Sequence, residues 1–314
     1  MSVLEGPRRE VRRVLVNDHA ERCEARDDVL VLEDGRTVGS DAVHLPAVTP
    51  ATIVCVHLNY RSRAEEFGVN IEGAHPTYFM KPCTAINAHA GDVARPADCG
   101  LLNYEGELAA VVGRTMRRVR PDAVWEHLAG FSCANDFGIH DFRDTDAGSM
   151  LRVKGQDGFC PIGPGVVSGV DVRRSVLRTF VNGHKVQEGA VAEMLWGIDE
   201  LLSDVTRHVT LRPGDVVLTG TPWHSRPVFP GDVVEVEIDG VGRLMNRVVP
   251  SEAPENFRGF PATITKTSLG VALGSDYHVL KRPDALPTPE QYRRMRDELA
   301  ARNMESGPPR RETR

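Results

Sequence analysis

The chain has 314 residues, of which 41% are hydrophobic and 26% charged, values that are ordinary for a soluble globular protein with one large domain or two unequal ones. Its formal net charge of −6 gives no electrostatic basis for binding nucleic acid or an anionic membrane surface. No apolar run approaches the roughly 18 residues that a membrane-spanning helix requires, so the sequence predicts neither a nucleic acid nor a membrane as partner.

Cysteine usage and the composition of the N-terminus both favour the cytoplasm. The six cysteines are scattered without a CxxC pair, which predicts reduced thiols that mostly serve in packing. Residues 1–13 are polar and charged, which is not the pattern of a secretory signal. We therefore expect a cytoplasmic protein.

Punctuating residues divide the chain into three regions. A hairpin is predicted over residues 29–38, where an Asp-Gly pair supplies the turn, and Pro46 and Pro50 then mark a boundary. The character of the chain changes again at Pro250. The predicted regions are a small β-rich segment over 1–50, a catalytic domain over 51–250 and a C-terminal extension over 251–314 with one helix and a disordered end.

Most elements predicted in the central region are strands. Asn182-Gly183 indicates a type I′ hairpin, and helices are predicted from Pro121 and over residues 195–205, where apolar residues recur on one face. A polar stretch over 57–68 is predicted to form a helical turn that ends at a glycine. The predicted strands lie at 51–56, 78–82, 103–113, 131–134, 175–181, 216–218, 231–238 and 243–249.

The C-terminal helix is predicted from its first residues. Thr288-Pro-Glu-Gln291 is a capping box with proline at the first helical position. A narrow apolar stripe of Tyr292, Met295 and Leu299 follows, which favours docking on the body of the protein or on a partner subunit. Residues 306–314 are expected to be disordered.

Two glutamates in one strand provide the first chemical signal. Side chains alternate along a strand, so Glu105 and Glu107 point to the same side, and Gly106 between them adds no bulk. Adjacent carboxylates at the mouth of an apolar strand repel each other unless water or a cation stabilises them. A lone Glu-x-Glu is more often a solvated strand end, so the interpretation depends on the rest of the chain.

Further polar residues stand at the ends of other predicted strands. Asp136 follows the strand over 131–134, Lys154 lies in an apolar context, and Thr221 sits in a turn next to glycine. With Glu105 and Glu107, three carboxylates are available, a set that suits a hard divalent ion such as Mg²⁺ or Mn²⁺. The histidines show no zinc-ligand spacing.

Five motifs in order resemble the fumarylacetoacetate hydrolase superfamily over residues 55 to about 250. Within it, the segments 151–158 and 177–183 are most similar to the branch of 2-hydroxyhepta-2,4-diene-1,7-dioate isomerases and 5-carboxymethyl-2-oxo-hex-3-ene-1,6-dioate decarboxylases. The motifs are Tyr104-Glu-Gly-Glu-Leu, Asn135-Asp136, Lys154 with Asp157-Gly158 and Pro161, Gly214-Asp215 with Thr219-Gly-Thr-Pro222, and Gly231-Asp-Val-Val-Glu-Val-Glu237.

This resemblance implies a mainly β fold with some α, a mixed β-roll catalytic domain that forms a homodimer. It implies that Mg²⁺ or Mn²⁺ is bound by Glu105, Glu107 and Asp136. Lys154 would stabilise developing enolate charge beside the ion. Substrate contacts are implied for a last set of residues: Thr221, Gly220, Tyr60 and Arg63.

The chain departs from the family pattern at three places. The family's lid carries a histidine three residues before a glutamate, but here Arg63 precedes Glu66, and an arginine cannot act as a base near neutral pH. His140 stands where family members often carry an arginine for a substrate carboxylate. We hypothesise that Arg63 anchors the substrate carboxylate and that His140 transfers the proton. The third departure is the loop 223–226, Trp-His-Ser-Arg, in place of small residues.

Three functions are compatible with these residues. The first is an isomerase or decarboxylase that acts through an enolate on a 2-oxo, 2-hydroxymuconate-type dicarboxylic acid, and the loss of the lid histidine favours it. The second is a C–C bond hydrolase of an acylpyruvate or a fumarylacetoacetate-like diketone, in which Glu66 alone orients water. The third is a catalytically altered or purely structural protein. The retained acidic residues and Lys154 count against the third, because unpaired buried charges are costly.

Overall fold

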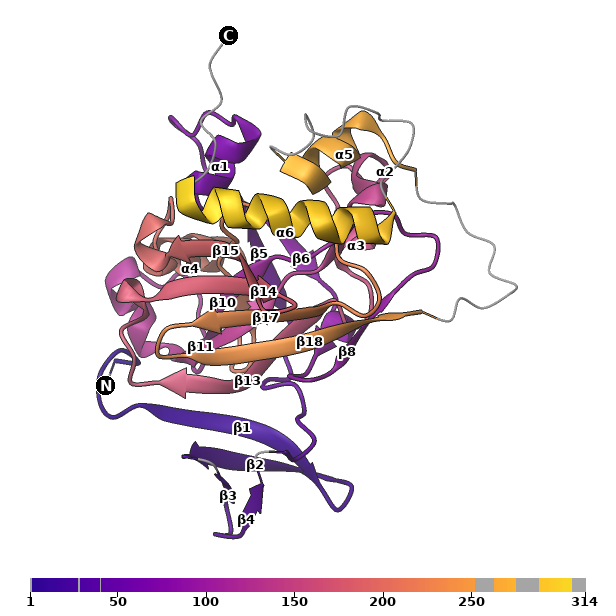
Figure 1. Ribbon diagram of the computed structural model, residues 1–314. Coiled ribbons are helices and arrows are strands. Elements are labelled where there is room, and N and C mark those ends of the chain that lie inside the picture. The colour runs from indigo at the N-terminus through magenta and orange to yellow at the C-terminus, as the bar shows by residue number, and fades with distance from the viewer. Residues whose placement is uncertain (1, 28, 40, 252–262, 275–287, 307–314) are drawn as a thin grey trace.

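Two large sheets form the body of the protein (Figure 1). The computed structural model describes residues 2–27, 29–39, 41–251, 263–274 and 288–306. Within them the first sheet has eleven strands in the order β4-β3-β2-β1-β13-β11-β10-β16-β5-β6, with β7 paired to β13. Its strands are β1 (Arg9–Val16), β2 (His19–Arg26), β3 (Val29–Leu32), β4 (Thr37–Gly39), β5 (Ile53–His57), β6 (Thr77–Lys81), β7 (Ile86–Asn87), β10 (Gly106–Val112), β11 (Leu128–Asn135), β13 (Cys160–Ser168) and β16 (Val216–Leu218).

The second sheet has the order β15-β14-β17-β18-β8, and β12 pairs separately with β9. Asn182 and Gly183 join β14 to β15 with φ angles of 53° and 81°, so the predicted type I′ turn is confirmed. The strands are β8 (Asp92–Arg95), β9 (Leu102–Asn103), β12 (Gly138–Ile139), β14 (Val176–Val181), β15 (His184–Ala190), β17 (Val233–Ile238) and β18 (Gly242–Pro250).

Helices are short and lie around the sheets. The segment predicted as a helix from Pro121 is a 3₁₀ segment, because β11 begins at Leu128 and leaves room for little more than one turn. The α-helices are α1 (Arg61–Phe67), α2 (Arg143–Asp146), α3 (Leu151–Lys154), α4 (Ile198–His208), α5 (Lys266–Leu273) and α6 (Pro289–Ser306). The 3₁₀ segments are η1 (Cys83–Ala85), η2 (Pro121–Glu126), η3 (His140–Phe142), η4 (Val172–Arg174) and η5 (Val191–Glu193). The described structure confirms a mainly β fold with some α.

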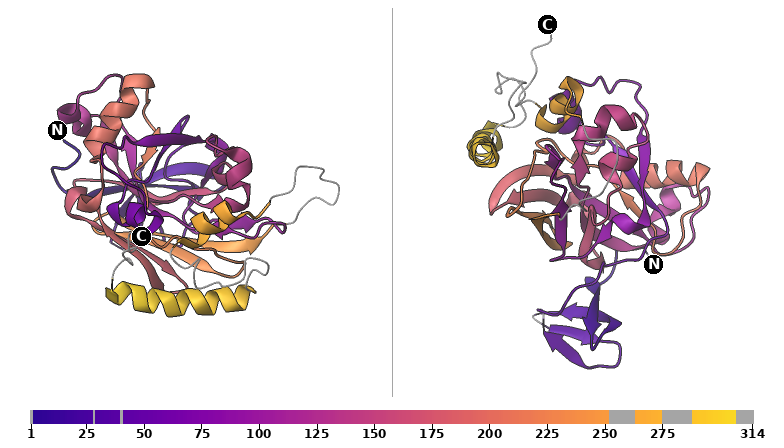
Figure 2. Two further views of the ribbon diagram at one scale, coloured as in Figure 1. Left: turned by 90° about the horizontal axis from the view of Figure 1, so that it is seen from above. Right: turned by 90° about the vertical axis from the view of Figure 1, so that its right-hand side faces the viewer.

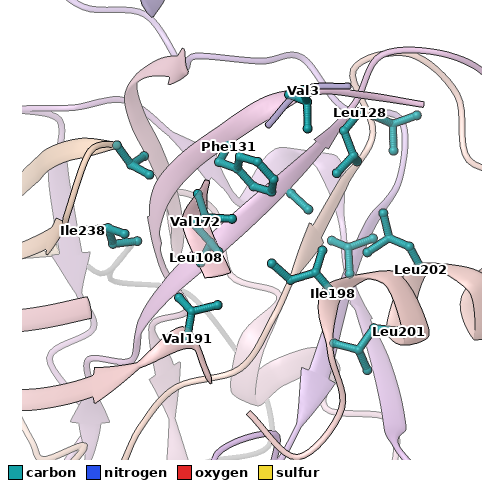
Figure 3. Packing of buried hydrophobic residues seen from close by; sticks show 14 of the residues in the cluster. Val3, Leu108, Leu128, Phe131, Val172, Val191, Ile198, Leu201, Leu202 and Ile238 are labelled. Atoms are coloured by element: carbon teal, nitrogen blue, oxygen red, sulfur yellow. The ribbon is translucent and has the colours of Figure 1, made fainter. Parts of the chain in front are cut away.

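The main hydrophobic core lies between the two sheets and is closed on one side by α4. Phe131 of β11 and Leu108 of β10 belong to it together with Ile238 of the second sheet (Figure 3). Ile198 and Leu202 of α4 complete it, which confirms the apolar face predicted there. Burying such side chains stabilises the fold by about 25 cal/mol per Å² of apolar surface that is removed from water. This core therefore supports the strands that carry the candidate site.

The N-terminal region extends the first sheet rather than standing apart from it. Residues 9–12 of β1 pair antiparallel with residues 165–168 of β13. Strands β1 to β4 then project from the body, as the right-hand view of Figure 2 shows. Pairing with β13 satisfies backbone groups on both strands, so this segment is joined to the catalytic body by a continuous ladder.

The C-terminal region contains two helices where the sequence predicts one. The predicted capping box is confirmed, because the Gln291 side chain accepts from the Thr288 amide at 2.9 Å and Thr288 Oγ1 accepts from the Gln291 amide at 3.3 Å. The additional helix, α5, has eight residues, and its polar residues lie together at its start instead of recurring along one face, so it does not show the helical periodicity that sequence analysis relies on. Disorder is predicted over residues 306–314. Ser306 is instead the last residue of α6, and residues 307–314 lie outside the described residues.

Each of the six cysteines is a free thiol, as predicted. Among the residues that the structure describes, none of the helices is long and apolar enough to span a lipid bilayer.

Candidate active site

The three predicted metal ligands meet at one end of a strand pair. Strands β10 and β11 are antiparallel, with Gly106 opposite Asn135, so the residues that flank this pair are neighbours. The Asp136 amide donates to the Glu105 carbonyl at 2.8 Å, which fixes the two backbones. One carboxylate oxygen from each of Glu105, Glu107 and Asp136 lies within 4.8 Å of the others. These three carboxylates form what we call the floor of the site.

The glycine between the two glutamates lies close to a side chain of the second sheet. A Cβ atom at Gly106 would lie 2.1 Å from Oγ1 of Thr179 on β14. Contacts this close do not occur in proteins, so any other residue here would require the buried Thr179 side chain to move. The Glu-Gly-Glu spacing therefore has two effects. It places both carboxylates on one side of the strand, and on the other side it leaves room for Thr179 of the second sheet.

Two lysines neutralise part of the floor. Lys154 at the end of α3 places Nζ 2.6 Å from Glu105 and 2.8 Å from Asp136. Although burial opposes a charged lysine, these two carboxylates raise the pKa of Lys154 above its usual value, so it stays protonated. Lys81 at the end of β6 contacts Asp136 Oδ1 at 2.5 Å. Sequence analysis missed Lys81, although a lysine at the end of an apolar strand is a recognisable signal.

Glu107 is the ligand that lacks a cationic partner among the described residues. Its Oε2 accepts from the Gly220 amide at 2.6 Å. Burial, together with the negative charges of Asp136 and Glu105, raises the pKa of Glu107 well above its usual value. The raised pKa favours the neutral acid at Glu107 as long as no cation faces it. With all three carboxylates ionised, the floor carries one negative charge more than its two lysines balance, and a bound cation would stabilise that state. Because all the donor atoms are hard carboxylate oxygens, the residues fit a Mg²⁺ or Mn²⁺ ion.

Helix α1 holds Glu66 in a buried ion-pair network. Arg63 donates to Glu66 at 2.8 Å and to Glu105 at 3.3 Å, and Arg226 donates to the other oxygen of Glu66 at 2.7 Å. Burial alone would raise the pKa of Glu66, but the two guanidinium groups lower it to about 2. The sequence pointed to the loop 223–226 but gave Arg226 no role. The predicted roles of Arg63 as substrate anchor and of Glu66 as a catalytic group stay predictions.

A group of neutral and cationic side chains lines the pocket beside the floor. His140 in η3 is buried, and neither ring nitrogen has a hydrogen-bond partner among the described residues. Burial, then the charges of Lys154, Arg143 and Arg63, lowers the pKa of His140 well below 6.5, so the ring is neutral. This placement agrees with the geometry that our proton-transfer hypothesis requires.

Arg143 was not predicted, and it is the pocket cation with the weakest partners. Its Nη2 lies 3.1 Å from Nε2 of His57, and its Nη1 lies 3.3 Å from Sδ of Met150. Burial, then Arg143 itself, lowers the pKa of His57 to about 4, so at neutral pH this partner is uncharged. No carboxylate among the described residues lies within ion-pair distance of Arg143, although burial already disfavours its charge.

The remaining predicted substrate residues take different positions. Thr221 lines the pocket, and its Oγ1 accepts from Gln187 at 3.0 Å. Gly220 adopts a φ of 96° and directs its amide at Glu107. Tyr60 is fully buried at the start of α1 and is not among the residues that line the pocket. The structure thus brings Thr221 and Gly220 to the cavity and its floor, whereas Tyr60 lies buried outside the cavity lining.

These side chains enclose a cavity of about 250 Å³. Its polar lining is the floor, Lys154, Thr221, His57, His140, Arg63 and Arg143. The apolar lining comes from several separate segments of the chain: Val56, Leu58, Phe67, Val69, Phe79 and Val271. A cavity with a polar acidic end and apolar walls suits a small organic acid that a metal holds at one end.

Comparisons with known proteins agree with this geometry. Residues 52–249 match the profile of the fumarylacetoacetate (FAA) hydrolase C-terminal family. The 4-hydroxyphenylacetate degradation bifunctional isomerase/decarboxylase of Salmonella dublin is 37% identical over 211 residues, which cover 66% of this chain and 49% of that protein. This chain thus matches about half the length of that relative. Oxaloacetate tautomerase YisK of Bacillus subtilis is 31% identical over 220 residues, which cover 66% of this chain and 72% of the tautomerase.

A solved structure gives the same result. The 5-carboxymethyl-2-hydroxymuconate delta-isomerase from Mycobacterium smegmatis superposes with a TM-score of 0.72 and 33% identity. The superposition covers 78% of this chain and 100% of the isomerase. The family profile spans well over half of the chain and includes every residue of the floor. The chain therefore belongs to the fumarylacetoacetate hydrolase family.

Proposed function

We propose that this protein is a divalent-metal-dependent isomerase/decarboxylase that acts on an enolisable 2-oxo dicarboxylic acid of the 2-hydroxymuconate type, as arises in aromatic ring-cleavage catabolism. The observation that carries the proposal is the convergence of Glu105, Glu107 and Asp136 beside Lys154 in one small cavity. The relatives whose names describe isomerases and decarboxylases support the class of reaction.

The carboxylates of the floor would hold Mg²⁺ or Mn²⁺, which supplies Lewis-acid stabilisation of the enolate that forms when the substrate loses a proton or CO₂. Lys154 places a permanent positive charge next to the same position and is kept there by Glu105 and Asp136. Thr221 presents a hydroxyl group at the cavity wall for a substrate oxygen.

We assign proton transfer to His140. In isomerisation a proton leaves the carbon next to the carbonyl and another is added further along the conjugated chain, so one group can accept and return it. The His140 ring lines the cavity, is neutral and has both nitrogens available within the described structure. In decarboxylation the same ring, once protonated, would deliver a proton to the carbon that loses CO₂.

We assign recognition of the second substrate carboxylate to Arg143. A buried guanidinium without a carboxylate partner is costly, and a substrate carboxylate would supply the missing counter-charge through paired hydrogen bonds. Arg63 is less suited to this task, because Glu66 and Glu105 already engage it. This assignment revises our sequence-based hypothesis, in which Arg63 anchors the substrate.

The hydrolase alternative needs a group that activates water. Arg63 replaces the lid histidine, and Glu66 is held between two guanidinium groups that keep it ionised but occupy its oxygens. A fumarylpyruvate hydrolase from Pseudomonas aeruginosa shares the fold, with a TM-score of 0.60 and 28% identity, so the alternative is included in the test. A binding protein without catalysis would bind metal but process no substrate.

Hydrogen–deuterium exchange tests the proposal directly. The purified protein is incubated in D₂O with pyruvate, 2-oxoglutarate or a 2-hydroxymuconate-type diacid, with Mg²⁺, Mn²⁺ or a chelator, and followed by NMR. We expect metal-dependent exchange at the carbon next to the carbonyl, together with isomerisation or CO₂ release from the unsaturated diacid. Cleavage of acylpyruvates with release of pyruvate would instead favour the hydrolase. Metal binding without any exchange would contradict the proposal.

The proposal includes a cytoplasmic homodimer that takes a small-molecule acid as its ligand. The free thiols of all six cysteines support a reducing compartment. Light scattering coupled to size-exclusion chromatography would give the mass of the assembly, and a mass near one chain of 34.5 kDa would contradict the dimer.

A further inference from the structure

We propose that helix α5 of the C-terminal region forms the outer wall of the substrate cavity, and that Val271 on this helix limits the length of the 2-oxo diacid that the cavity accepts. The inference rests on the proposed function, whose reaction it makes more specific. Val271 lines the same cavity as the floor, although it lies more than 20 residues beyond the end of the family profile at residue 249.

A backbone contact fixes α5 close to the strand that leads into the floor. The Asn103 side chain, at the end of β9 and two residues before Glu105, donates to the Ala272 carbonyl at 2.8 Å. Both groups are buried, so the bond is made away from competing water. Loss of a buried bond of this kind would leave both polar groups unsatisfied, so the bond favours this position of the helix.

Apolar packing holds the helix in the same place. Leu269 and Leu273 are buried in a cluster that also contains Leu101, from the segment before β9, and Phe229. Tyr292 of α6 belongs to this cluster. Arg293 and Arg296 of α6 in turn contact the buried Asp232 at 2.8 and 3.2 Å. The position of α5 is therefore set by the body of the protein and by α6 together.

The helix also touches the elements that carry the proposed catalytic groups. It packs against η3, which contains His140, and against α2, which begins with Arg143. At its end, a Cβ on Gly274 would lie 2.3 Å from Oε1 of Glu66. Figure 1 shows α5 above α2 at the end of the molecule where α1 also lies. Helix α5 is thus part of the wall around the site.

This helix lies outside the residues that match the family profile, because the match ends at residue 249 and α5 begins at Lys266. Val271 is half-buried, and it contributes an apolar surface next to the region in which Arg143 would receive a distal carboxylate. A longer substrate would have to extend past this side chain.

Two opposite substitutions at one position test the inference. We would measure metal-dependent deuterium exchange next to the carbonyl for pyruvate, oxaloacetate, 2-oxoglutarate and 2-oxoadipate with wild-type protein, Val271→Phe and Val271→Ala. The expected change is a drop in kcat/KM for 2-oxoadipate relative to pyruvate of about tenfold in Val271→Phe and a rise of similar size in Val271→Ala, the effect of a methylene or two in an apolar pocket. Thr267→Phe is the control, because Thr267 is exposed on the same helix.

The outcomes separate the inference from the proposed function. Unchanged ratios in both Val271 variants, or equal changes in Thr267→Phe, would overturn the inference while leaving the function intact. Absence of exchange by the wild-type protein with all four acids would overturn the function. In that case calorimetric titration of the Mn²⁺-loaded wild type and variants with the same acids would test the inference. The quantity compared is then the ratio of the dissociation constants for 2-oxoadipate and pyruvate. If Val271→Phe fails to fold, as shown by its melting curve, Val271→Ala decides alone.

Discussion

The floor and the wall of the cavity are built in opposite ways. The floor comes from the ends of β10 and β11, which lie side by side in one sheet and share backbone hydrogen bonds. By the wall we mean the three short helices α1, α2 and α5, which come from distant parts of the sequence and each contribute side chains to the cavity lining. A sheet can hold metal ligands to within a fraction of an ångström, whereas short helices on loops can vary without disturbing it. This difference places the reaction in the floor and substrate selection in the wall.

The charges follow the same division. In the floor, Glu105 and Asp136 are paired with lysines, whereas Glu107 lacks a cation among the described residues and its raised pKa shows that its charged form needs one. In the wall, the partners of Arg143 within the described structure are uncharged. One region is therefore incomplete without a cation and the other without an anion, as is required of a site for a metal-bound acid.

The largest effect is expected from a change in the floor. Glu107→Gln removes one negative ligand, so the Lewis-acid contribution of several kcal/mol is lost and metal-dependent exchange should fall by about 1,000-fold. Calorimetry should show weakened Mn²⁺ binding. Glu237→Gln, on the more exposed surface of β17, is the matched control and should change neither quantity. Full activity of Glu107→Gln would remove the basis for the metal site.

A second prediction concerns the stability of the floor. Lys154→Met removes the cation that Glu105 and Asp136 share and leaves them with Arg63 and Lys81 alone. We expect the free energy of unfolding of the metal-free protein to fall by about 3 kcal/mol. Mg²⁺ should restore more stability to the variant than to wild type, because the ion supplies the missing charge. Urea denaturation with and without Mg²⁺ measures both. Lys185→Met removes an exposed pair with Glu188 and should have little effect.

In the wall we expect a smaller effect that depends on the substrate. Arg143→Gln should lower kcat/KM for 2-oxoglutarate relative to the monoacid 2-oxobutyrate by about 30-fold, the value of roughly 2 kcal/mol for hydrogen bonds to a charged group. Arg143→Lys should recover part of the loss. Equal reductions for the two acids would show that Arg143 supports the fold instead of recognising a carboxylate.

The smallest effect is a pH dependence of stability. Burial and Arg143 lower the pKa of His57 in the folded protein to about 4, against 6.5 when unfolded. The unfolded chain therefore binds the extra proton first, and this contribution to stability is present above pH 6.5 and lost as the pH falls towards 4. When the pH falls from 6.5 to 5, the free energy of unfolding of His57→Asn should decrease by about 1 kcal/mol less than that of wild type, as measured by urea titrations. A matching change in the exposed His184→Asn would contradict this assignment.

Sequence analysis could predict the floor because its signals are local. Alternation along one strand places Glu105 and Glu107 on one side, and the strand that follows brings Asp136 next to them. The mainly β fold and the hairpin at Asn182-Gly183 follow from equally short patterns. Lys154 was noted for its apolar context, and the family resemblance then gave it a role beside the ion.

The wall could not be predicted in the same way. Arg143 and Arg226 acquire their roles from partners 86 and 160 positions away, His57 and Glu66, and no local pattern specifies such contacts. Helix α5 is eight residues long and its polar residues are grouped at its start, so its sequence gives no periodic signal. The replacement of the lid residue by Arg63 was visible, but its pairing with Glu105 depends on how α1 packs.

The pairing of β1 with β13 has a consequence for handling the protein in concentrated solution. Without residues 9–12, the backbone amides and carbonyls of residues 165–168 would form an open sheet edge that can recruit a strand from another molecule. In the intact chain the sheet instead ends at β4, which is three residues long and offers little template. A protein trimmed to the family domain, residues 52–249, should therefore aggregate more readily than the 314-residue chain, whatever its activity.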